Sequence, residues 1–335
     1  MTSHEWRVLS TYESSDILIR LYALIHGGSV LSPKRASEIA AWFAQGREYF
    51  AAAKDSGPLV RPLLQYYGVL GLARGTILLL HDGSNHGLKE SHGLKAKDWT
   101  NTLRTKAGRP TISFKVEDGT FLSLAKATKN RDAFSYHHQL RLNGRRDQEF
   151  PLDGLLGASF SMKDTLARIA DIGPIFRRCM DERPCAVPAS LSITDLDGAF
   201  FTMHTDMDVS HEALMQTFGL VNPWTPRGHM SGSHCFMITN DLDWAAHMPQ
   251  MEELGDASHA AIAAYPNGLH LSRLLRIHLL SAFLGTFARY HPEPWMIAVH
   301  GHADGDHIMP LIGAAMNLID QEYPRLIVQE IERRM

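Results

Sequence analysis

The chain lacks the features that would direct it into or through a membrane. Residues 1–6 contain no basic stretch followed by an apolar run, which a secretory signal requires. No segment approaches the roughly 18 uninterrupted apolar residues of a membrane-spanning helix. The three cysteines include no Cys-x-x-Cys pair and their number is odd, so no disulfide framework is indicated. These absences predict a cytoplasmic protein with no membrane partner.

Common motifs of nucleotide and hydrolase sites are missing as well. There is no P-loop, no Gly-x-Ser-x-Gly, and no Gly-x-Gly-x-x-Gly in a fitting context. Residues 300–307 resemble the zinc-binding loop of metallo-β-lactamases, but the last histidine is displaced by two positions and no histidine follows His307. Four aspartates alternate with apolar residues, which indicates a solvated strand face rather than a cation site: Asp195, Asp197, Asp206 and Asp208. We therefore predict no metal and no cofactor.

Composition and periodicity predict a mainly helical protein. The 335 residues are 44% hydrophobic and 21% charged, with a net charge of -3, which is typical of a folded chain long enough for two packed units. We predict a helical bundle frame with a small antiparallel β insert (α+β). Three regions follow from this reading: an N-terminal helical region 1–105, a mixed region 106–240, and a C-terminal helical region 241–335 that packs on the first.

The two N-terminal helices have the clearest signals. Ser32 followed by Pro33 is a helix start, and an apolar stripe continues through residues 36–54. Residues 62–80 are apolar on almost every side, so this helix should be central and buried. Its three glycines should allow close packing against neighbours: Gly68, Gly71 and Gly75.

The remaining elements follow from alternation, periodicity and turn residues. A hairpin is predicted from residues 111–116 and 120–124, and a short helix over 162–172 that stops before Gly173 and Pro174. Further strands are expected at 189–193, 199–204 and 234–239. Later helices are expected at 269–290, 308–322 and 324–333.

Charge is distributed unevenly along the chain. Residues 89–147 carry 13 Lys or Arg against 6 Asp or Glu, whereas the other residues carry 20 against 30. Such a segment faces either a polyanion or an acidic surface of its own chain. For the first alternative, RNA or single-stranded DNA is the partner, and nine residues are candidates for contact: Lys95, Lys97, Arg104, Lys106, Arg109, Lys129, Arg131, Arg145 and Arg146.

Several phrases resemble the YaaC-like family, and they occur in the expected order across most of the chain. They are Gln45-Gly46-Arg47-Glu48-Tyr49-Phe50, Leu63-Leu64-Gln65-Tyr66-Tyr67-Gly68, His92-Gly93-Leu94, Phe160-Ser161-Met162-Lys163-Asp164 and Ala288-Arg289-Tyr290-His291-Pro292. The resemblance implies no settled activity. The helical opening also resembles the HEPN superfamily of nucleic-acid-associated domains, many of which are ribonucleases.

HEPN ribonucleases use an arginine and a histidine separated by four to six residues. The histidine serves as acid or base, and the arginine stabilises the phosphate charge. Six such pairs occur here among 23 Arg and 19 His, which is scarcely above chance. Arg273 and His278 have the shortest spacing on a helix and are the catalytic candidates, although the polar residue that often follows the arginine is missing.

Two other pairs, Arg131–His137 and Arg74–His81, are further candidates. A structural role competes with the functional one for each: an ion pair for Arg74, a core-edge position for His278 and a solvated loop for Arg131. Because Arg74 is the only formal charge between Pro62 and Leu80, it should be at least partly buried and paired with a carboxylate or with backbone carbonyls.

Two functional hypotheses follow. In the first, the protein is nucleic-acid-associated, as a ribonuclease or a component of stress or defence. In the second, it is a non-catalytic interaction protein that acts through a protein partner. Formation of a homo-oligomer is compatible with both.

Overall fold

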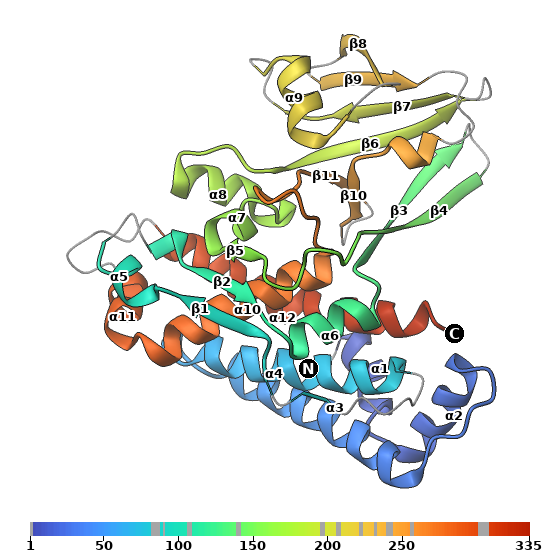
Figure 1. The fold of residues 1–335 in the computed structure, drawn as a ribbon, viewed down its shortest axis with the longest axis vertical. Helices are drawn as coiled ribbons and strands as arrows, with labels where there is room; N and C mark the ends of the chain where they lie inside the picture. The colour runs from blue at the N-terminus through green and yellow to red at the C-terminus, as the bar shows by residue number, and fades with distance from the viewer. Residues whose placement is uncertain are drawn as a thin grey trace. The chain divides into compact units, whose positions relative to one another are not determined.

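The computed structural model describes residues 3–81, 88–89, 91–105, 109–138, 142–194, 198–205, 209–220, 224–230, 233–238, 244–254, 258–300 and 308–335. The chain forms two compact units, each built from separate segments. Unit 1 comprises Met1–Asn130, Leu152–Thr165 and Leu274–Met335, and unit 2 comprises Arg131–Pro151 and Leu166–Arg273. The secondary structure is of the mixed α+β class (Figure 1).

Unit 1 contains most of the helices and a small sheet. Its helices are α1 (His4–Thr11), α2 (Ser15–Ile25), α3 (Pro33–Lys54), α4 (Arg61–Leu80), α5 (Trp99–Thr102), α6 (Thr120–Ala127), α11 (Pro292–His300) and α12 (Met309–Glu332), with the 3-10 turn η1 (Arg109–Thr111). Helices α7 (Met162–Leu166) and α10 (Arg273–Tyr290) lie in it except for one terminal residue each. Its strands are β1 (Leu94–Lys97), β2 (Ser113–Val116) and β5 (Ser159–Ser161).

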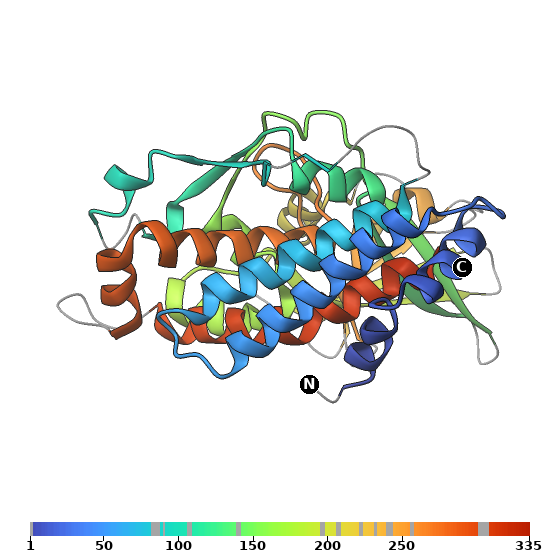
Figure 2. The same ribbon diagram turned by 90° about the horizontal axis from the view of Figure 1, so that it is seen from below.

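Helices α3 and α4 pack side by side, and α12 packs on α4 (Figure 2). The predicted start of α3 is confirmed, because Ser32 Oγ accepts a hydrogen bond from the Arg35 amide and Pro33 begins the helix. The predicted close packing of α4 is also confirmed. A Cβ atom added at Gly71 would lie 2.8 Å from Gly46 Cα, a backbone atom that cannot rotate away.

Helix α4 is the core of unit 1. Among the described residues it is the one helix long and apolar enough to cross a membrane by length and composition, and 72% of its most apolar window is buried inside the protein. Its N-terminal half meets α10, since a Cβ atom at Gly285 would lie 2.5 Å from Tyr66 Cβ. The burial predicted from the sequence is therefore confirmed.

Strands β1, β2 and β5 form an antiparallel sheet with β2 in the middle. The predicted partner of β2, residues 120–124, is instead part of α6, so the hairpin prediction was wrong. Phe121, Leu124 and Ala125 recur at helical spacing and are buried, which favours a helix over a half-buried strand. Gly119 serves close packing rather than a hairpin turn, because its Cβ would lie 2.4 Å from the Gly93 amide nitrogen.

Unit 2 is built around a sheet of eight described strands. They are β3 (Arg131–His138), β4 (Leu142–Glu149), β6 (Ala186–Thr194), β7 (Gly198–Met203), β8 (Thr225–Met230), β9 (Ser233–Ile238), β10 (Gln250–Glu253) and β11 (His259–Ile262). Six follow the order β10-β11-β6-β7-β9-β8, while β3 pairs with β4 and, in parallel over two residues, with β6. The predicted strands 189–193, 199–204 and 234–239 correspond to β6, β7 and β9, and the sheet contains more strands than the sequence pattern predicted.

Short helices complete unit 2: α8 (Gly173–Met180), α9 (His211–Phe218), η2 (Ala170–Ile172) and η3 (Trp244–His247). Helix α9 lies against the sheet (Figure 1), with Leu214 and Phe218 in the same apolar cluster as Phe201 and Phe236. Ser210 caps its N-terminus and Gly219, at a φ of 68°, ends it in the left-handed conformation.

Two proline positions were misread in the sequence. Gly173 and Pro174 were expected to end a helix, but they begin α8, where a proline at the first turn loses no hydrogen bond. Pro324 was expected to separate two helices, but it lies inside the single helix α12. Its neighbours Tyr323 and Ile327 are fully buried, so their packing offsets the hydrogen bond that proline removes.

The boundaries of the parts also differ from the three predicted regions. Strands β10 and β11, which fall in the predicted C-terminal helical region, belong to unit 2. Helices α11 and α12 contact each other, and α12 also contacts α1 and α4 within unit 1.

Candidate nucleic-acid interface

Three lysines share one face of the small sheet in unit 1. Lys95 and Lys97 are two residues apart on β1, so their side chains leave the strand on the same side. Lys115 of β2 lies directly opposite Lys95 in the antiparallel register. All three are exposed to solvent. We call Lys95, Lys97 and Lys115 the lysine face.

The pairing of Lys95 with Lys115 is electrostatically unfavourable. Like charges directly opposite each other destabilise a strand pair, so a bound anion would relieve the repulsion. Lys95 Nζ is 3.5 Å from Glu117 Oε1, but both side chains are well exposed, so this ion pair contributes little. Within the part of the chain that the structure describes, the side chain of Lys115 forms no hydrogen bond or ion pair.

Serines continue the lysine face across the sheet. Ser113 lies opposite Lys97, and β5 places Ser159 opposite Lys115. The alternate residues of β2 and β5 point to the other side, where Phe114 and Phe160 are 2% and 1% exposed. The sheet therefore has one apolar side and one side of lysine and serine, both of which are side chains that contact phosphates.

The other predicted nucleic-acid contacts are distributed over both units. Arg104 and Lys129 are exposed and Arg109 is buried in unit 1, whereas Arg145 and Arg146 are exposed on β4 of unit 2. Lys106 lies outside the described residues. Arg145 Nη2 is 3.9 Å from Glu253 Oε2, and Arg109 is 5% exposed. Of the predicted contacts, Lys95 and Lys97 are therefore the two that lie on the lysine face.

Arg131 does not lie in a solvated loop, so that reading was wrong. It begins β3 and is 8% exposed, with Nη1 3.3 Å from Asp147 Oδ2 on the paired strand. The side chain of His137 is outside the described set. An ion pair across a strand pair accounts for the position of Arg131.

A second basic feature of unit 1 is a pocket of about 680 Å³. It is lined by one carboxylate, Asp118, and by four cations: Lys89, Lys126, Lys129 and Arg334. The pocket also contains the C-terminal ends of α2, α4 and α6, and Arg334 follows the end of α12. Each helix end carries about half a negative charge. Arg334 Nη2 donates to the Ala127 carbonyl at 3.0 Å, so this cation compensates the end of α6, while Lys89 is paired with Asp118.

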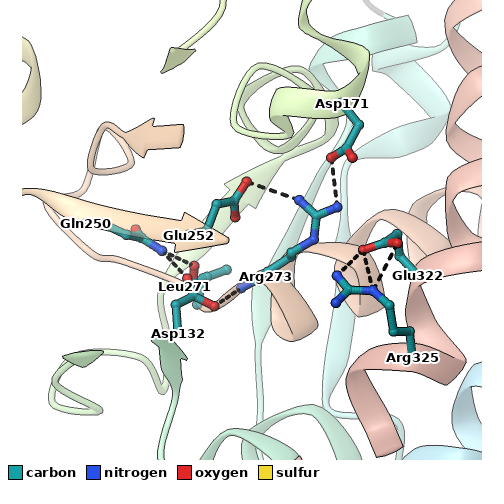
Figure 3. A network of polar contacts seen from close by, with 8 residues as sticks. All are labelled: Asp132, Asp171, Gln250, Glu252, Leu271, Arg273, Glu322 and Arg325. Carbon is teal, nitrogen blue, oxygen red and sulfur yellow. Dashed lines mark hydrogen bonds and ion pairs between the residues drawn. The ribbon is translucent and has the colours of Figure 1, made fainter. Parts of the chain in front are cut away.

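Arg273, a catalytic candidate, is buried in a polar network of unit 2 (Figure 3). Its side chain is 4% exposed, with Nη1 3.1 Å from Glu252 Oε1 and Nη2 2.8 Å from Asp171 Oδ2. Glu252 is itself 1% exposed. A buried guanidinium held by two carboxylates is positioned for structural stabilisation, since a phosphate would have to displace an existing partner.

The network continues through Asp132. One oxygen of its carboxylate accepts a hydrogen bond from the Arg273 backbone amide at 2.8 Å, and the other accepts from Gln250 Nε2 at 2.8 Å. Gln250 Nε2 also donates to the Leu271 carbonyl, and its Oε1 is 2.8 Å from His270 Nδ1. Both carboxylate oxygens of Asp132 are therefore used in fixing the start of α10 (Figure 3). The same view includes an ion pair of unit 1, Arg325 with Glu322 three residues earlier on α12.

His278, the other catalytic candidate, is fully buried in unit 1 rather than at the edge of the core. Its Nδ1 lies 3.0 Å from the Tyr323 hydroxyl, and its ring meets Tyr66 and Phe121. Burial, together with the smaller effect of the nearby His92, lowers the pKa of His278 to about 3. The imidazole is therefore neutral at pH 7, and neither candidate side chain is exposed at the surface.

Arg74 is half-buried, as the sequence predicted. Its Nε is 3.5 Å from Thr120 Oγ1, and its guanidinium carbon lies 4.8 Å from the centre of the Trp42 ring. A hydroxyl and an aromatic face are thus among its partners. The predicted carboxylate or carbonyl partner stays a prediction.

The acidic and metal-like motifs fall mainly on residues whose structure is not described. Asp195, Asp197, Asp206 and Asp208 lie outside the described residues, as does the stretch 301–307. Among the residues that are described, no group of three or more His, Cys, Asp or Glu side chains is arranged to hold a metal ion.

Lys115 is the residue of the lysine face that the sequence reading missed. Its strand was predicted, but it was assigned to a hairpin with residues 120–124, so its pairing with β1 did not emerge. The sequence does contain a signal for this pairing. Polar and apolar residues alternate in two short segments, Lys95-Ala96-Lys97 and Ser113-Phe114-Lys115, as in strands with one polar face.

Comparisons with known proteins give one result. A family model described as YaaC-like Protein matches residues 21–331. Neither the comparison with curated proteins nor the comparison with solved structures gives a match.

Proposed function

The chain belongs to the YaaC-like family, and for this member we propose that the lysine face binds the phosphates of single-stranded RNA or DNA. The observation that carries the proposal is the exposed pairing of Lys95 with Lys115 beside Lys97. Three cations held on one small sheet repel each other, and a phosphate backbone would offset that repulsion.

The chemistry of the lysine face favours binding without sequence preference. Lysine and serine side chains contact phosphates and sugars, which are the same in every sequence. Lysine acts as a flexible point charge, so it accommodates the variable geometry of a single strand. The sequence resemblance of the helical opening to HEPN domains is a second reason for the proposal. The binding needs no catalytic step by Arg273 or His278.

The test is fluorescence polarisation with a labelled 20-nucleotide uridine RNA and the matching thymidine DNA, between 50 and 200 mM salt. Each phosphate contact to a single strand contributes about 0.7 to the slope of log affinity against log salt. The double variant Lys95→Gln/Lys115→Gln should therefore lower the slope by about 1.4. The matched control Lys34→Gln/Lys54→Gln changes two exposed lysines at the two ends of α3. It should leave the slope of log affinity against log salt unchanged.

Two results would contradict the proposal: no binding of either nucleic acid at 50 mM salt, or an equal slope in both double variants. Gel analysis of the RNA after incubation tests ribonuclease activity separately. A protein partner with an acidic surface is the alternative function, because the same lysines would attract it. Failure of nucleic-acid binding leaves that alternative as the function to pursue by cross-linking from position 95.

A further inference from the structure

The apolar side of the small sheet covers a cavity of about 280 Å³ in unit 1. Leu94, Ala96 and Phe114 line it, and they are the residues of β1 and β2 that alternate with the lysine face. Gly285 and Thr286 of α10 form the opposite wall. The volume lies just below the usual lower limit of ligand pockets, so a molecule of one or two rings would fill it.

One cation dominates the electrostatics of this cavity. Arg289 lines it and is exposed, and the described lining residues include no carboxylate. The two histidines of the lining are uncharged at neutral pH. Burial lowers the pKa of His92, with further lowering by Arg74 and Arg289, and burial lowers the pKa of His291. The cavity therefore favours a ligand with a single negative charge over a neutral or cationic one.

The guanidinium of Arg289 lies beside two aromatic side chains. Its carbon lies 4.8 Å from the Tyr290 ring centre and 5.8 Å from that of Tyr67, and Nη1 donates to the Tyr67 hydroxyl. This bond engages one nitrogen of the guanidinium fork. A planar carboxylate suits such a fork, since it accepts two parallel hydrogen bonds.

A polar atom inside the cavity wall has no partner. His92 Nδ1 is buried and makes no hydrogen bond with any described residue. The His92 ring lies 5.7 Å from the Tyr66 ring, which also lines the cavity. A buried polar atom without a partner is costly, and a ligand with a polar ring atom would satisfy it.

From this geometry we infer that the cavity binds a small aromatic carboxylic acid of one or two rings. The carboxylate pairs with Arg289, the ring lies between Tyr66 and Phe114, and a polar ring atom meets His92. The aromatic walls supply apolar area and ring contacts, while the single cation supplies the charge preference. This site is independent of phosphate binding at the lysine face, because the two use opposite sides of β1 and β2.

Isothermal titration calorimetry with four probes tests the inference: indole-3-carboxylate, indole, tryptamine and adenosine 5′-monophosphate. The acid should bind at least tenfold more tightly than indole, which lacks the charge, and tryptamine should not bind. Saturation with the acid should also shift the His92 ring signals in NMR spectra. Tighter binding of the nucleotide than of the acid would overturn the assignment, as would absence of binding by the acid.

Two variants locate the site. Arg289→Gln removes the charge from an exposed side chain, and Ala96→Trp fills the cavity without changing charge. Each should weaken binding of the acid at least tenfold, while Arg35→Gln on α3 and Lys95→Gln/Lys115→Gln should leave it unchanged. Thermal melts confirm that each variant is folded. Unaltered binding in both Arg289→Gln and Ala96→Trp would overturn the inference, even if the wild-type protein binds the acid.

Discussion

Replacing Arg273 by alanine should destabilise unit 2 by about 3–5 kcal/mol, the range found when one partner of a buried ion pair is removed. The structural reason is the burial of both partners, since the side chains of Arg273 and Glu252 are 4% and 1% exposed. Asp171 is 27% exposed, so water can solvate it in the variant. Glu252 would instead lose its guanidinium partner in a dry environment, and that loss dominates the cost.

The size of unit 2 converts this free energy into a melting shift. It contains roughly 130 residues, for which 1 kcal/mol corresponds to about 3–4 °C. The Arg273→Ala transition of unit 2 should therefore lie about 10–20 °C below that of the wild type in differential scanning calorimetry.

A double-mutant cycle shows whether the ion pair is the cause. Glu252→Gln keeps an oxygen that accepts from Arg273 and leaves Asp171 in place, so it should cost less than Arg273→Ala. The double variant Arg273→Ala/Glu252→Gln should be more stable than Arg273→Ala alone, because the buried carboxylate of Glu252 is then replaced by a neutral amide. A melting point of Arg273→Ala within about 2 °C of wild type would refute this reasoning and return Arg273 to the functional candidates.

Three further predictions concern unit 1. The pKa of His278 falls from 6.5 to about 3 on folding, so the stability that the neutral imidazole contributes is complete above pH 6.5 and is lost as the pH falls toward 3. The free energy of unfolding in urea should therefore fall by about 2 kcal/mol from pH 7 to pH 5. This loss should be absent in His278→Gln. Gly71→Ala should cost about 1–3 kcal/mol by forcing backbones apart, whereas Gly313→Ala, in open space on α12, should gain up to about 1 kcal/mol in the same chemical melts. Arg74→Ala should cost at least about 1–2 kcal/mol, which is the contribution of its contacts with Trp42 and Thr120 alone. An unshifted thermal midpoint would contradict the observed contacts.

The sequence predicted best those elements whose signals are local. The start of α3 follows from Ser32 and Pro33, and the burial of α4 follows from its uninterrupted apolar surface. Prolines were harder, because a proline either opens a helix or interrupts one. Pro174 opens α8 and Pro324 is tolerated within α12, and only the packing around each residue decides between these outcomes.

The candidate site depended on pairing between distant segments, which periodicity does not encode. Lys95 and Lys97 were predicted contacts because they belong to a basic segment, but Lys115 joined them only through the register of β1 and β2. The hairpin prediction failed for the same reason. One partner of β2 is β5, which begins at Ser159, far along the sequence from the predicted partner 120–124. Similarly, the burial of Arg273 depends on Glu252 and Asp171, which adjoin it only in the folded chain.

The division of unit 1 into three segments sets an order of events during synthesis on the ribosome. Helix α4 ends at Leu80, but α12, which packs on it, begins at Met309. At roughly 5–20 residues per second, about 10–50 s pass before that helix can be delivered. During this interval the apolar sides of α3 and α4 lack their final cover, and every segment of unit 2 is synthesised before α12 begins. We expect nascent chains stopped before α12 to recruit chaperones strongly, and chains stopped after Met335 to be released from them.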